Sequence, residues 1–377
     1  MAKSKMQELA EFGQSIWLDY IDRPLLETDK LKRMIDNGLR GMTSNPSIFN
    51  SAIGSSADYD RAIRKLKNEG KTTFEIYDEL TVKDIQEAAD QFRMVYDATN
   101  GLDGYVSLEI DPRIAHKTEE QIKEGLRLHK KVNRPNLMVK VPSTAAGIPV
   151  IEQLTARGVN INATLIFSLR QYEQVAKAYF SGLQRRVSEG ADISKIHSVA
   201  SVFVSRIDTM VDKMIQKKSA DGANAGQEQL SGLKGKAAVA NSRIIFEQSG
   251  RLHAADPFTA LKAKDANAQR VLWGSTGTKD PEYSDIKYIT ELIASPTVNT
   301  VPEKTLNAFL GHGEVKSAFT GGADAARGVI DVLLRNGIDV EAVCAELLDK
   351  GVVAFDDAFT ELMASIEKKA ATLSSVK

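Results

Sequence analysis

The sequence predicts an α/β fold, a (β/α)8 TIM barrel with additional helices. Three observations lead to this expectation: short β-type runs recur along the chain, amphipathic helical stretches separate them, and polar residues gather near the carboxyl ends of the runs. Eight strands that each precede a helix are what a closed barrel of this class requires. The expected strands span residues 15–21, 41–47, 104–111, 136–142, 158–167, 198–207, 270–276 and 297–302.

The first four strands differ in how polar they are. In "SIWLDYI", Asp19 shares parity with Trp17, and in "GYVSLEID" apolar residues alternate with Tyr, Ser and Glu. "GMTSNPS" is short and polar, whereas "NLMVKVP" is an apolar run broken by Lys140. Strands of a parallel sheet that are buried on both faces normally read as continuous apolar runs. The polar residues within these strands therefore require an explanation other than packing in a parallel sheet.

The last four strands follow the same scheme. In "GVNINATLIF", Asn160, Asn162 and Thr164 share one parity, and apolar residues occupy the other. "SVASVFVSRI", "RVLWGST" and "TVNTVP" complete the set. Period-2 alternation sends one set of side chains towards the helices and the other into the barrel.

The helical stretches exceed a minimal barrel. "EEQIKEGLRLHKKV" and "LRQYEQVAKAYFSGLQRRV" carry apolar residues at helical spacing, as crossover helices should. We expect a single domain over residues 1–377, with helical insertions near 51–100 and 208–269 and a helical C-terminal extension that covers the site mouth or forms a dimer surface. A doubly wound open sheet is the alternative, but no strand is followed by GxGxxG or GxxxxGK[ST], which disfavours its nucleotide-binding forms.

Composition excludes several classes of partner. The 377 residues carry 49 basic and 50 acidic side chains, so the net charge of −1 gives no reason to expect nucleic acid or an anionic membrane. No segment reaches the roughly 18 apolar residues of a membrane-spanning helix. The amino-terminal residues lack the apolar stretch of a secretory signal, so we expect a cytoplasmic protein. The single cysteine, Cys344, lies in a helical pattern and is expected in the core.

We expect neither a metal nor another cofactor. The five histidines form no HExxH or HxH pattern, and none falls among the inward strand positions. Zinc chemistry is therefore disfavoured, although spacing alone leaves magnesium held by carboxylates as an alternative.

Lys140 is the residue that indicates a reaction. Burial disfavours the charged form of an amine, and a neutral amine is the nucleophile that forms a Schiff base with a carbonyl. The protonated imine then accepts electrons from a carbon–carbon bond beside it. Asp19 and Glu109 on neighbouring strands are candidates for moving protons and handling water.

The inward polar residues form a candidate site at the carboxyl ends of the strands. A lone inward asparagine or threonine is better explained as a hydrogen-bonded core residue, and a strand lysine can reach solvent or pair with a carboxylate. Their number is what favours an active site, since barrel enzymes place their chemistry at this end. The set comprises Asp19, Asn45, Glu109, Lys140, Asn162, Thr164 and Ser201.

A phosphate site is expected near strands six and seven. Arg206 follows strand six, and Ser275 and Lys279 follow strand seven in "WGSTGTK". Arginine binds phosphate with two hydrogen bonds, and small residues at a strand-to-helix turn expose backbone N–H donors. Lys279 is equally explained as a solvated loop charge.

Five motifs resemble those of transaldolase, in its longer-chain branch. They are "MTSNPSIF", "VSLEIDPRI", "LMVKVPSTAAGI", "NINATLIFS" and "VFVSRID", and they occur in the family's order. The resemblance implies a class I Schiff-base enzyme of the non-oxidative pentose phosphate pathway. It implies transfer of a dihydroxyacetone unit from sedoheptulose 7-phosphate or fructose 6-phosphate to glyceraldehyde 3-phosphate or erythrose 4-phosphate.

The resemblance also implies catalytic roles. Lys140 falls on the Schiff-base lysine and Asp19 on the acid/base for bond cleavage. Glu109 and Thr164 fall on the pair that holds the water needed to form and hydrolyse the imine.

Substrate-binding roles follow in the same way. Asn45 and Asn162, with Ser201 beside them, fall on residues that bind the substrate hydroxyls, and Arg206 falls on a phosphate ligand. The family often has a second arginine after the strand-seven serine, whereas this chain has Lys279 near that place. Lysine would serve as a point charge rather than as a fork.

Two other functions remain open at this stage. A simple aldolase on the same barrel would release free dihydroxyacetone, although glutamate at position 109 favours the transferase. A catalytically silent barrel that binds sugar phosphates or acts as a scaffold belongs to a different class. The sequence does not choose between a monomer and a homodimer.

Overall fold

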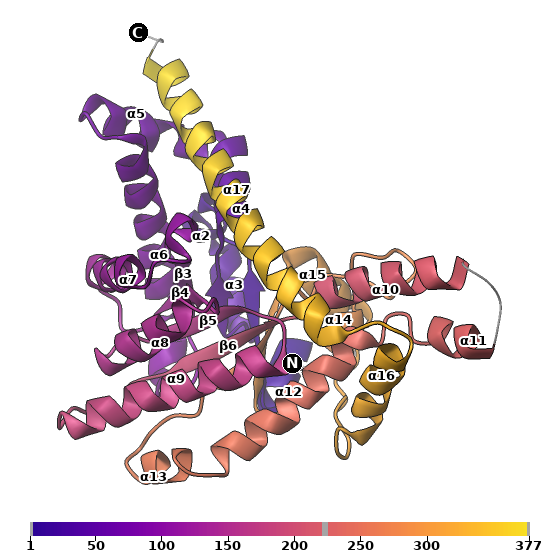
Figure 1. Cartoon of the computed structure of the whole chain (residues 1–377). Helices are drawn as coiled ribbons and strands as arrows, with labels where there is room; N and C mark the ends of the chain where they lie inside the picture. Colours follow the sequence, from indigo (N-terminus) through magenta and orange to yellow (C-terminus); the bar gives the residue numbers. More distant parts are fainter. Residues whose placement is uncertain (1–2, 221–224, 375–377) are drawn as a thin grey trace.

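The chain forms a closed barrel of eight parallel strands, as the sequence predicts and the open doubly wound alternative does not. The computed structural model describes residues 3–220 and 225–374 (Figure 1). Each strand pairs in parallel with the next, and β8 pairs with β1. The strands are β1 (Gln14–Asp19), β2 (Gly41–Thr43), β3 (Tyr105–Glu109), β4 (Leu137–Pro142), β5 (Ile161–Ile166), β6 (Ser198–Phe203), β7 (Arg270–Gly274) and β8 (Thr297–Val301).

All eight strands are shorter than predicted, and the second and the sixth each end four residues early. The second was expected to continue to residue 47, but β2 ends at Thr43, because Asn45 caps α4 and Pro46, which has no N–H, begins it. The sixth was expected to reach residue 207, but β6 ends at Phe203 and α10 begins at Ser205. In both cases the polar residues that follow the strand belong to a helix or to its cap.

Helices surround the barrel in the first half of the chain. They are α1 (Lys5–Phe12), α2 (Arg23–Glu27), α3 (Asp29–Asp36), α4 (Pro46–Phe49), the π-helix η1 (Asn50–Gly54), the 3₁₀ turn η2 (Ala57–Tyr59), α5 (Asp60–Asn68), α6 (Thr73–Ala98), the 3₁₀ turn η3 (Pro112–Ile114), α7 (Thr118–Val132), α8 (Gly147–Ala156) and α9 (Leu169–Ser188). The predicted insertion near 51–100 therefore consists of η1, η2, α5 and α6.

The second half adds the other insertion and the C-terminal extension. Its helices are α10 (Ser205–Ala220), α11 (Ala225–Ser231), α12 (Ala237–His253), α13 (Phe258–Lys262), α14 (Lys287–Thr290), α15 (Glu303–His312), α16 (Asp324–Arg335) and α17 (Val340–Ser374). Within the segment 208–269, the described residues are mostly helical, and residues 221–224 lie outside the described part. After β8 the described chain consists of helices and loops.

Two separate apolar clusters hold the barrel. The larger lies between the strands and the helices. The smaller fills the barrel interior and consists of Trp17, Tyr105, Met138, Val199, Leu272 and Val298, which alternate along their strands with residues of the outer cluster. Gly41 makes room for this packing, since a Cβ there would lie 2.7 Å from the Trp17 ring.

The amino-terminal end of the barrel is closed by a buried ion pair. Arg270 on β7 reaches Asp103 with an N–O distance of 2.7 Å, and both side chains are almost fully buried. Ser15 donates to Asp103 (2.7 Å) and accepts from Arg270 (2.9 Å). A buried charge pair with its hydrogen bonds made is a structural feature, and at this end of a TIM barrel it contributes to stability rather than to chemistry.

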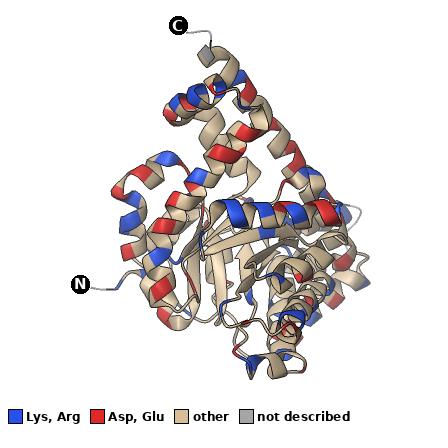
Figure 2. Cartoon of the chain, turned by 90° about the vertical axis from the view of Figure 1, so that its left-hand side faces the viewer, with Lys and Arg blue, Asp and Glu red and all other residues tan. Residues whose placement is uncertain are grey.

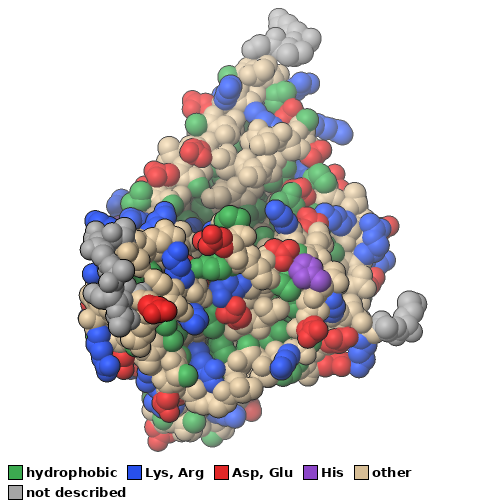
Figure 3. Space-filling model, turned by 90° about the vertical axis from the view of Figure 1, so that its right-hand side faces the viewer, with side chains coloured by type: hydrophobic (Ala, Val, Ile, Leu, Met, Phe, Trp, Pro, Cys, Tyr) green, Lys and Arg blue, Asp and Glu red, His purple; other side chains and the backbone are tan. Residues whose placement is uncertain are grey.

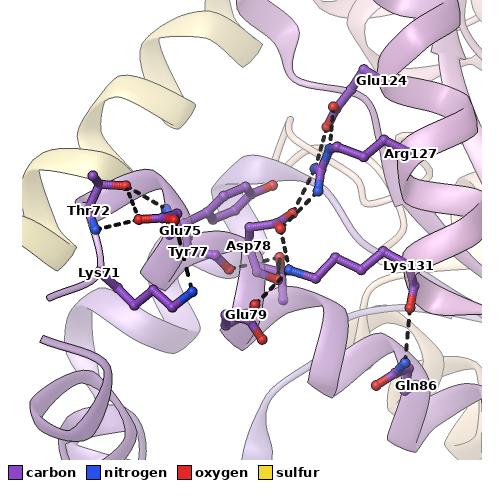
Figure 4. A network of polar contacts seen from close by, with 11 residues as sticks. Lys71, Thr72, Glu75, Tyr77, Asp78, Glu79, Gln86, Glu124, Arg127 and Lys131 are labelled. Atoms are coloured by element: carbon purple, nitrogen blue, oxygen red, sulfur yellow. Dashed lines mark hydrogen bonds and ion pairs between the residues drawn. The ribbon is translucent and has the colours of Figure 1, made fainter. Parts of the chain in front are cut away.

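Charged side chains otherwise lie mainly on the helices (Figure 2). One network joins the insertion to the barrel: Asp78 on α6 accepts from Arg127 on α7 at 2.7 Å, and Lys131 on α7 donates to Glu79 at 2.8 Å (Figure 4). Acidic and basic groups are interspersed over the face in Figure 3, without a broad area of one sign on that face. Within the described residues, no helix has the length and apolar composition needed to cross a bilayer.

The longest helix, α17, runs from the barrel mouth past α4 towards α5 (Figure 1). Phe355, in its middle, lines the cavity at the mouth. The C-terminal extension therefore contributes a side chain to the cavity wall. Cys344 near the start of α17 is buried, as predicted.

Candidate active site

A cavity of about 340 Å³ opens at the carboxyl ends of the strands. This is the end at which barrel enzymes place their chemistry. Eight of the ten residues predicted for the site lie in its wall: Asp19, Asn45, Lys140, Thr164, Ser201, Arg206, Ser275 and Lys279. The other two, Glu109 and Asn162, lie directly behind the wall and contact its residues, Glu109 bonding Lys140 and Asn162 bonding Ser201.

Lys140 lies at the centre of this group. Its side chain is almost fully buried, and its Nζ donates to the carbonyl of Ser44 (3.0 Å) and to Oε2 of Glu109 (3.3 Å). The strand register accounts for the contact between Lys140 and Glu109. Glu109 on β3 is the register partner of Lys140 on β4, and Lys140 is in turn the register partner of Asn162 on β5. The amine is therefore held at a fixed place beside a carboxylate.

Asp19 ends β1 and faces the same space. Its Oδ1 accepts a hydrogen bond from Thr43 Oγ1 at 2.8 Å, and Thr43 Oγ1 lies 2.6 Å from Thr300 Oγ1. Burial raises the pKa of Asp19, and Lys140, the Thr43 hydrogen bond and Lys279 oppose the increase. A carboxylate with a raised pKa is a better proton acceptor than a solvated one, as acid/base chemistry requires.

Glu109 and Thr164 offer two polar groups beside the amine. Burial also raises the pKa of Glu109, and the ion pair with Lys140 works against that increase. The Thr164 hydroxyl is fully buried and has no hydrogen-bond partner within the described residues. It is free to bind a water molecule or a substrate hydroxyl.

An amide and hydroxyl chain lines the floor between β3 and β6. Ser201 Oγ donates to Asn162 Oδ1 (2.6 Å), and Asn162 Nδ2 donates to Ser107 Oγ (3.0 Å). Asn45 is held differently: its Oδ1 accepts from the Ile48 N–H at 3.0 Å and thereby caps α4. These bonds fix the orientation of both amides.

The two predicted phosphate-binding cations form no close ion pair in the described part of the chain. Neither Arg206 nor Lys279 forms an ion pair with any residue of ranges 3–220 and 225–374. Burial lowers the pKa of the Arg206 guanidinium, which lies 5.6 Å from the Phe203 ring. Lys279 lines the cavity and its side chain is exposed, so a solvated loop charge stays the alternative.

Ser275 marks the turn between β7 and the Lys279 loop. Its φ of 54° is left-handed, a conformation that non-glycine residues rarely adopt and that clusters at functional sites. Ser205, the first residue of α10, holds it: the Ser205 N–H donates to the Ser275 carbonyl at 3.1 Å, and the two hydroxyls lie 3.0 Å apart.

Several cavity residues escaped prediction. Thr43 and Thr300 lie on the inner face of β2 and β8, and their parity with Asn45 and Val298 could have indicated them. Phe355 carries no such signal, because a phenylalanine in an amphipathic helix is indistinguishable from a core residue. Within the described part, no group of three or more His, Cys, Asp or Glu side chains is arranged to hold a metal ion.

Comparison with known proteins agrees with this geometry. The model of the family "Transaldolase/Fructose-6-phosphate aldolase" matches residues 16–366. The chain belongs to this family. The transaldolase of Saccharopolyspora erythraea is 45% identical over 97% of the chain and 98% of its own length. Transaldolase 2 of a Nostoc species is 43% identical over the full length of both chains.

Membership in the transaldolase family gives the cavity a chemical meaning. Transaldolase 1 of Streptomyces coelicolor, at 43% identity over 96% of the chain, adds a third relative of the same description. Family and relatives together support a transaldolase function, which is that of a transferase acting on sugar phosphates.

Thr43→Val tests the environment of Asp19. The Thr43 hydroxyl stabilises the carboxylate and so keeps its pKa from rising further. If ionised Asp19 is the proton acceptor, loss of that hydrogen bond should move the acidic limb of the kcat/KM profile to higher pH. On the plateau, kcat should fall by less than about tenfold, the equivalent of one lost hydrogen bond.

The measurement is transaldolase activity as a function of pH. Thr372→Val, on the exposed C-terminal part of α17, is the matched control and should leave the profile unchanged. A limb in Thr43→Val that stays in place or moves to lower pH contradicts this interpretation of Asp19.

Proposed function

We propose that this transaldolase acts through a Schiff base on Lys140. The donors would be sedoheptulose 7-phosphate and fructose 6-phosphate, and the acceptors erythrose 4-phosphate and glyceraldehyde 3-phosphate, in the non-oxidative pentose phosphate pathway. The supporting observation is a buried amine, 3.3 Å from one carboxylate and in the same cavity wall as another. A site of this kind supplies both the nucleophile and the proton acceptors.

The first step joins the donor to the enzyme. The Lys140 nitrogen attacks the ketose C2 carbonyl carbon, and loss of water leaves a protonated imine. Glu109 is the nearest carboxylate and would take up the proton that Lys140 must lose. Thr164, whose hydroxyl has no partner in the described part, would hold the departing and returning water with it.

The second step breaks a carbon–carbon bond. Asp19 takes the proton of the C4 hydroxyl, the C3–C4 bond breaks, and its electrons pass into the imine. The shortened aldose phosphate leaves, and a dihydroxyacetone unit remains on Lys140 as an enamine. Its carbon then attacks the acceptor aldehyde, Asp19 returns the proton to the new hydroxyl, and hydrolysis frees the product.

The remaining residues would position the substrate. Asn162 and Ser201 form one hydrogen-bonded unit and, with Asn45, would bind the hydroxyls. Arg206 and Lys279 would bind the terminal phosphate, together with the turn that Ser275 makes.

The terminal phosphate of the substrate would be the anion that pairs with Arg206 and Lys279. Electrostatic attraction between a phosphate and an unpaired guanidinium is strong in a partly buried site. Ser275 and Ser205, at the start of α10, would add hydroxyl and backbone donors next to Arg206.

Three further properties belong to this proposal. We propose one domain over residues 1–377, supported by a single apolar cluster that extends from Met6 to Ala370. A cytoplasmic location fits the proposed pathway. The oligomeric state is either a monomer or a homodimer, and the sedimentation coefficient of the protein in solution distinguishes the two.

The requirement for an acceptor tests the transferase against the simple aldolase. Fructose 6-phosphate should be consumed rapidly only when erythrose 4-phosphate is present, with sedoheptulose 7-phosphate as product. Product analysis by chromatography and mass spectrometry provides the measurement. Release of dihydroxyacetone without acceptor, at a rate similar to that of transfer, would identify an aldolase instead.

Arg206→Ala tests the phosphate site. Loss of a charge-assisted interaction should lower kcat/KM for fructose 6-phosphate about 10- to 100-fold. Turnover of unphosphorylated fructose should change little, since it has no phosphate to lose. Lys279→Ala should act in the same direction, and Lys279→Arg should restore most of the activity.

The matched control is Lys67→Ala, which removes an exposed lysine on α5. Steady-state kinetics with both donors gives the answer. An equal loss on fructose and on fructose 6-phosphate would show that Arg206 serves the fold or the chemistry and not the phosphate.

A further inference from the structure

Helix α17 makes contacts with the barrel and its adjoining segments on both sides of the cavity. On the β5 side, Cys344 contacts the Phe167 carbonyl at 3.4 Å, and Gly351 packs against Leu165. A Cβ at Gly351 would lie 3.1 Å from Leu165, so a small residue lets the helix approach the barrel here. This brings the middle of α17 over the mouth.

On the β2 side the contacts are polar. Ser365 donates to Asn50 Oδ1 (3.1 Å), and Asn50 Nδ2 donates to Glu361 (3.4 Å). Further along, Lys369 forms an ion pair with Asp60 (3.1 Å). Asn50 begins the π-helix η1, and the segment that precedes it supplies cavity residues. The helix is thus tied to the same segment that carries part of the substrate site.

Phe355 lies between these two attachments. Its side chain is only 7% exposed and lines the cavity, and the centroid of its ring is 5.8 Å from Lys140 Nζ. An imine formed on that nitrogen would place the carbon atoms of the dihydroxyacetone unit next to the ring. No step of the proposed mechanism uses Phe355.

The enamine on Lys140 has two possible fates. Its nucleophilic carbon can attack the acceptor aldehyde, which forms a carbon–carbon bond, and the new alkoxide takes a proton. Alternatively, the same carbon takes a proton from water. A second water then adds to the imine carbon, the C–N bond breaks, Lys140 regains its amine, and free dihydroxyacetone is released. Only the second fate needs a proton from solvent at that carbon.

We propose that Phe355 is a specificity-determining residue that shields the enamine carbon from water and thereby favours transfer over release. This inference rests on the proposed Schiff-base function. An apolar ring at the mouth excludes water and has no acidic proton of its own, whereas a hydroxyl or another acidic group at that position could donate a proton to the enamine carbon. Glu109 lies 3.3 Å from the amine, and the Thr164 hydroxyl has no partner within the described residues, so both stay available for controlled hydrolysis.

The test compares two variants at Phe355. Phe355→Ala removes the bulk and the ring, and Phe355→Leu removes the ring but keeps most of the apolar cover. The quantity measured is the rate of dihydroxyacetone release from fructose 6-phosphate alone, divided by the rate of transfer to erythrose 4-phosphate. Val353→Ala, a 58% exposed position on the same helix, is the matched control.

The ratio of release to transfer should rise in the order wild type, Leu, Ala, with an increase of about tenfold in Phe355→Ala. The control should match wild type. A ratio in Phe355→Ala within twofold of wild type overturns the inference. An equal rise in the Leu and Ala variants also overturns it, because the ring's interaction with the nitrogen would then matter and not the exclusion of water.

Borohydride trapping of each variant separates the two levels of the proposal. If wild type neither transfers nor forms an adduct on Lys140, the proposed function itself fails. If wild type does both and every variant forms the adduct, an unchanged ratio rejects only the role of Phe355. If a variant forms no adduct, Phe355 is needed for the reaction of the Lys140 amine with the substrate. That result rejects the shielding role.

Discussion

The contact between Lys140 and Glu109 inside the closed barrel is the interaction on which the site depends. Two opposite charges 3.3 Å apart, both nearly excluded from water, are tolerated only if their surroundings hold them in register. Here the register of β3, β4 and β5 does so, and the Ser44 carbonyl accepts a second bond from the amine. Either group alone would leave an uncompensated buried charge. Together they hold an amine and a carboxylate within hydrogen-bonding distance of each other.

The barrel can accommodate this buried ion pair because its stabilising contacts and its polar cavity lie at different levels of the barrel. Trp17 and its neighbours fill the lower interior, and Arg270 with Asp103 closes the amino-terminal end. The upper layer is then free to carry Asp19, whose pKa is raised by burial. The Thr164 hydroxyl lies in the cavity wall and has no hydrogen-bond partner within the described residues. A buried hydroxyl of this kind is suited to bind a substrate or a water molecule.

Sequence reasoning succeeded where strand periodicity carries the information. The alternation in "VNINATL" and the lysine in "LMVKVP" indicated the barrel face correctly, because neighbouring parallel strands bring residues of one parity together. It failed where the chain leaves the strands. Asn45 was expected in the second strand but caps α4, and the sixth strand was expected to reach residue 207, but α10 begins at Ser205 and carries Arg206. Phe355 could not be found, since its approach to Lys140 depends on how α17 packs more than 200 residues away along the chain.

The central claim is that Lys140 forms the covalent intermediate, and reductive trapping tests it most directly. The protein is incubated with fructose 6-phosphate and sodium borohydride, and its peptides are analysed by mass spectrometry. We expect one reduced adduct on the peptide that contains Lys140. The adduct should be retained in Asp19→Asn, which still forms the imine, and absent from Lys140→Ala. An adduct on a different lysine, or none in active wild-type enzyme, would contradict it.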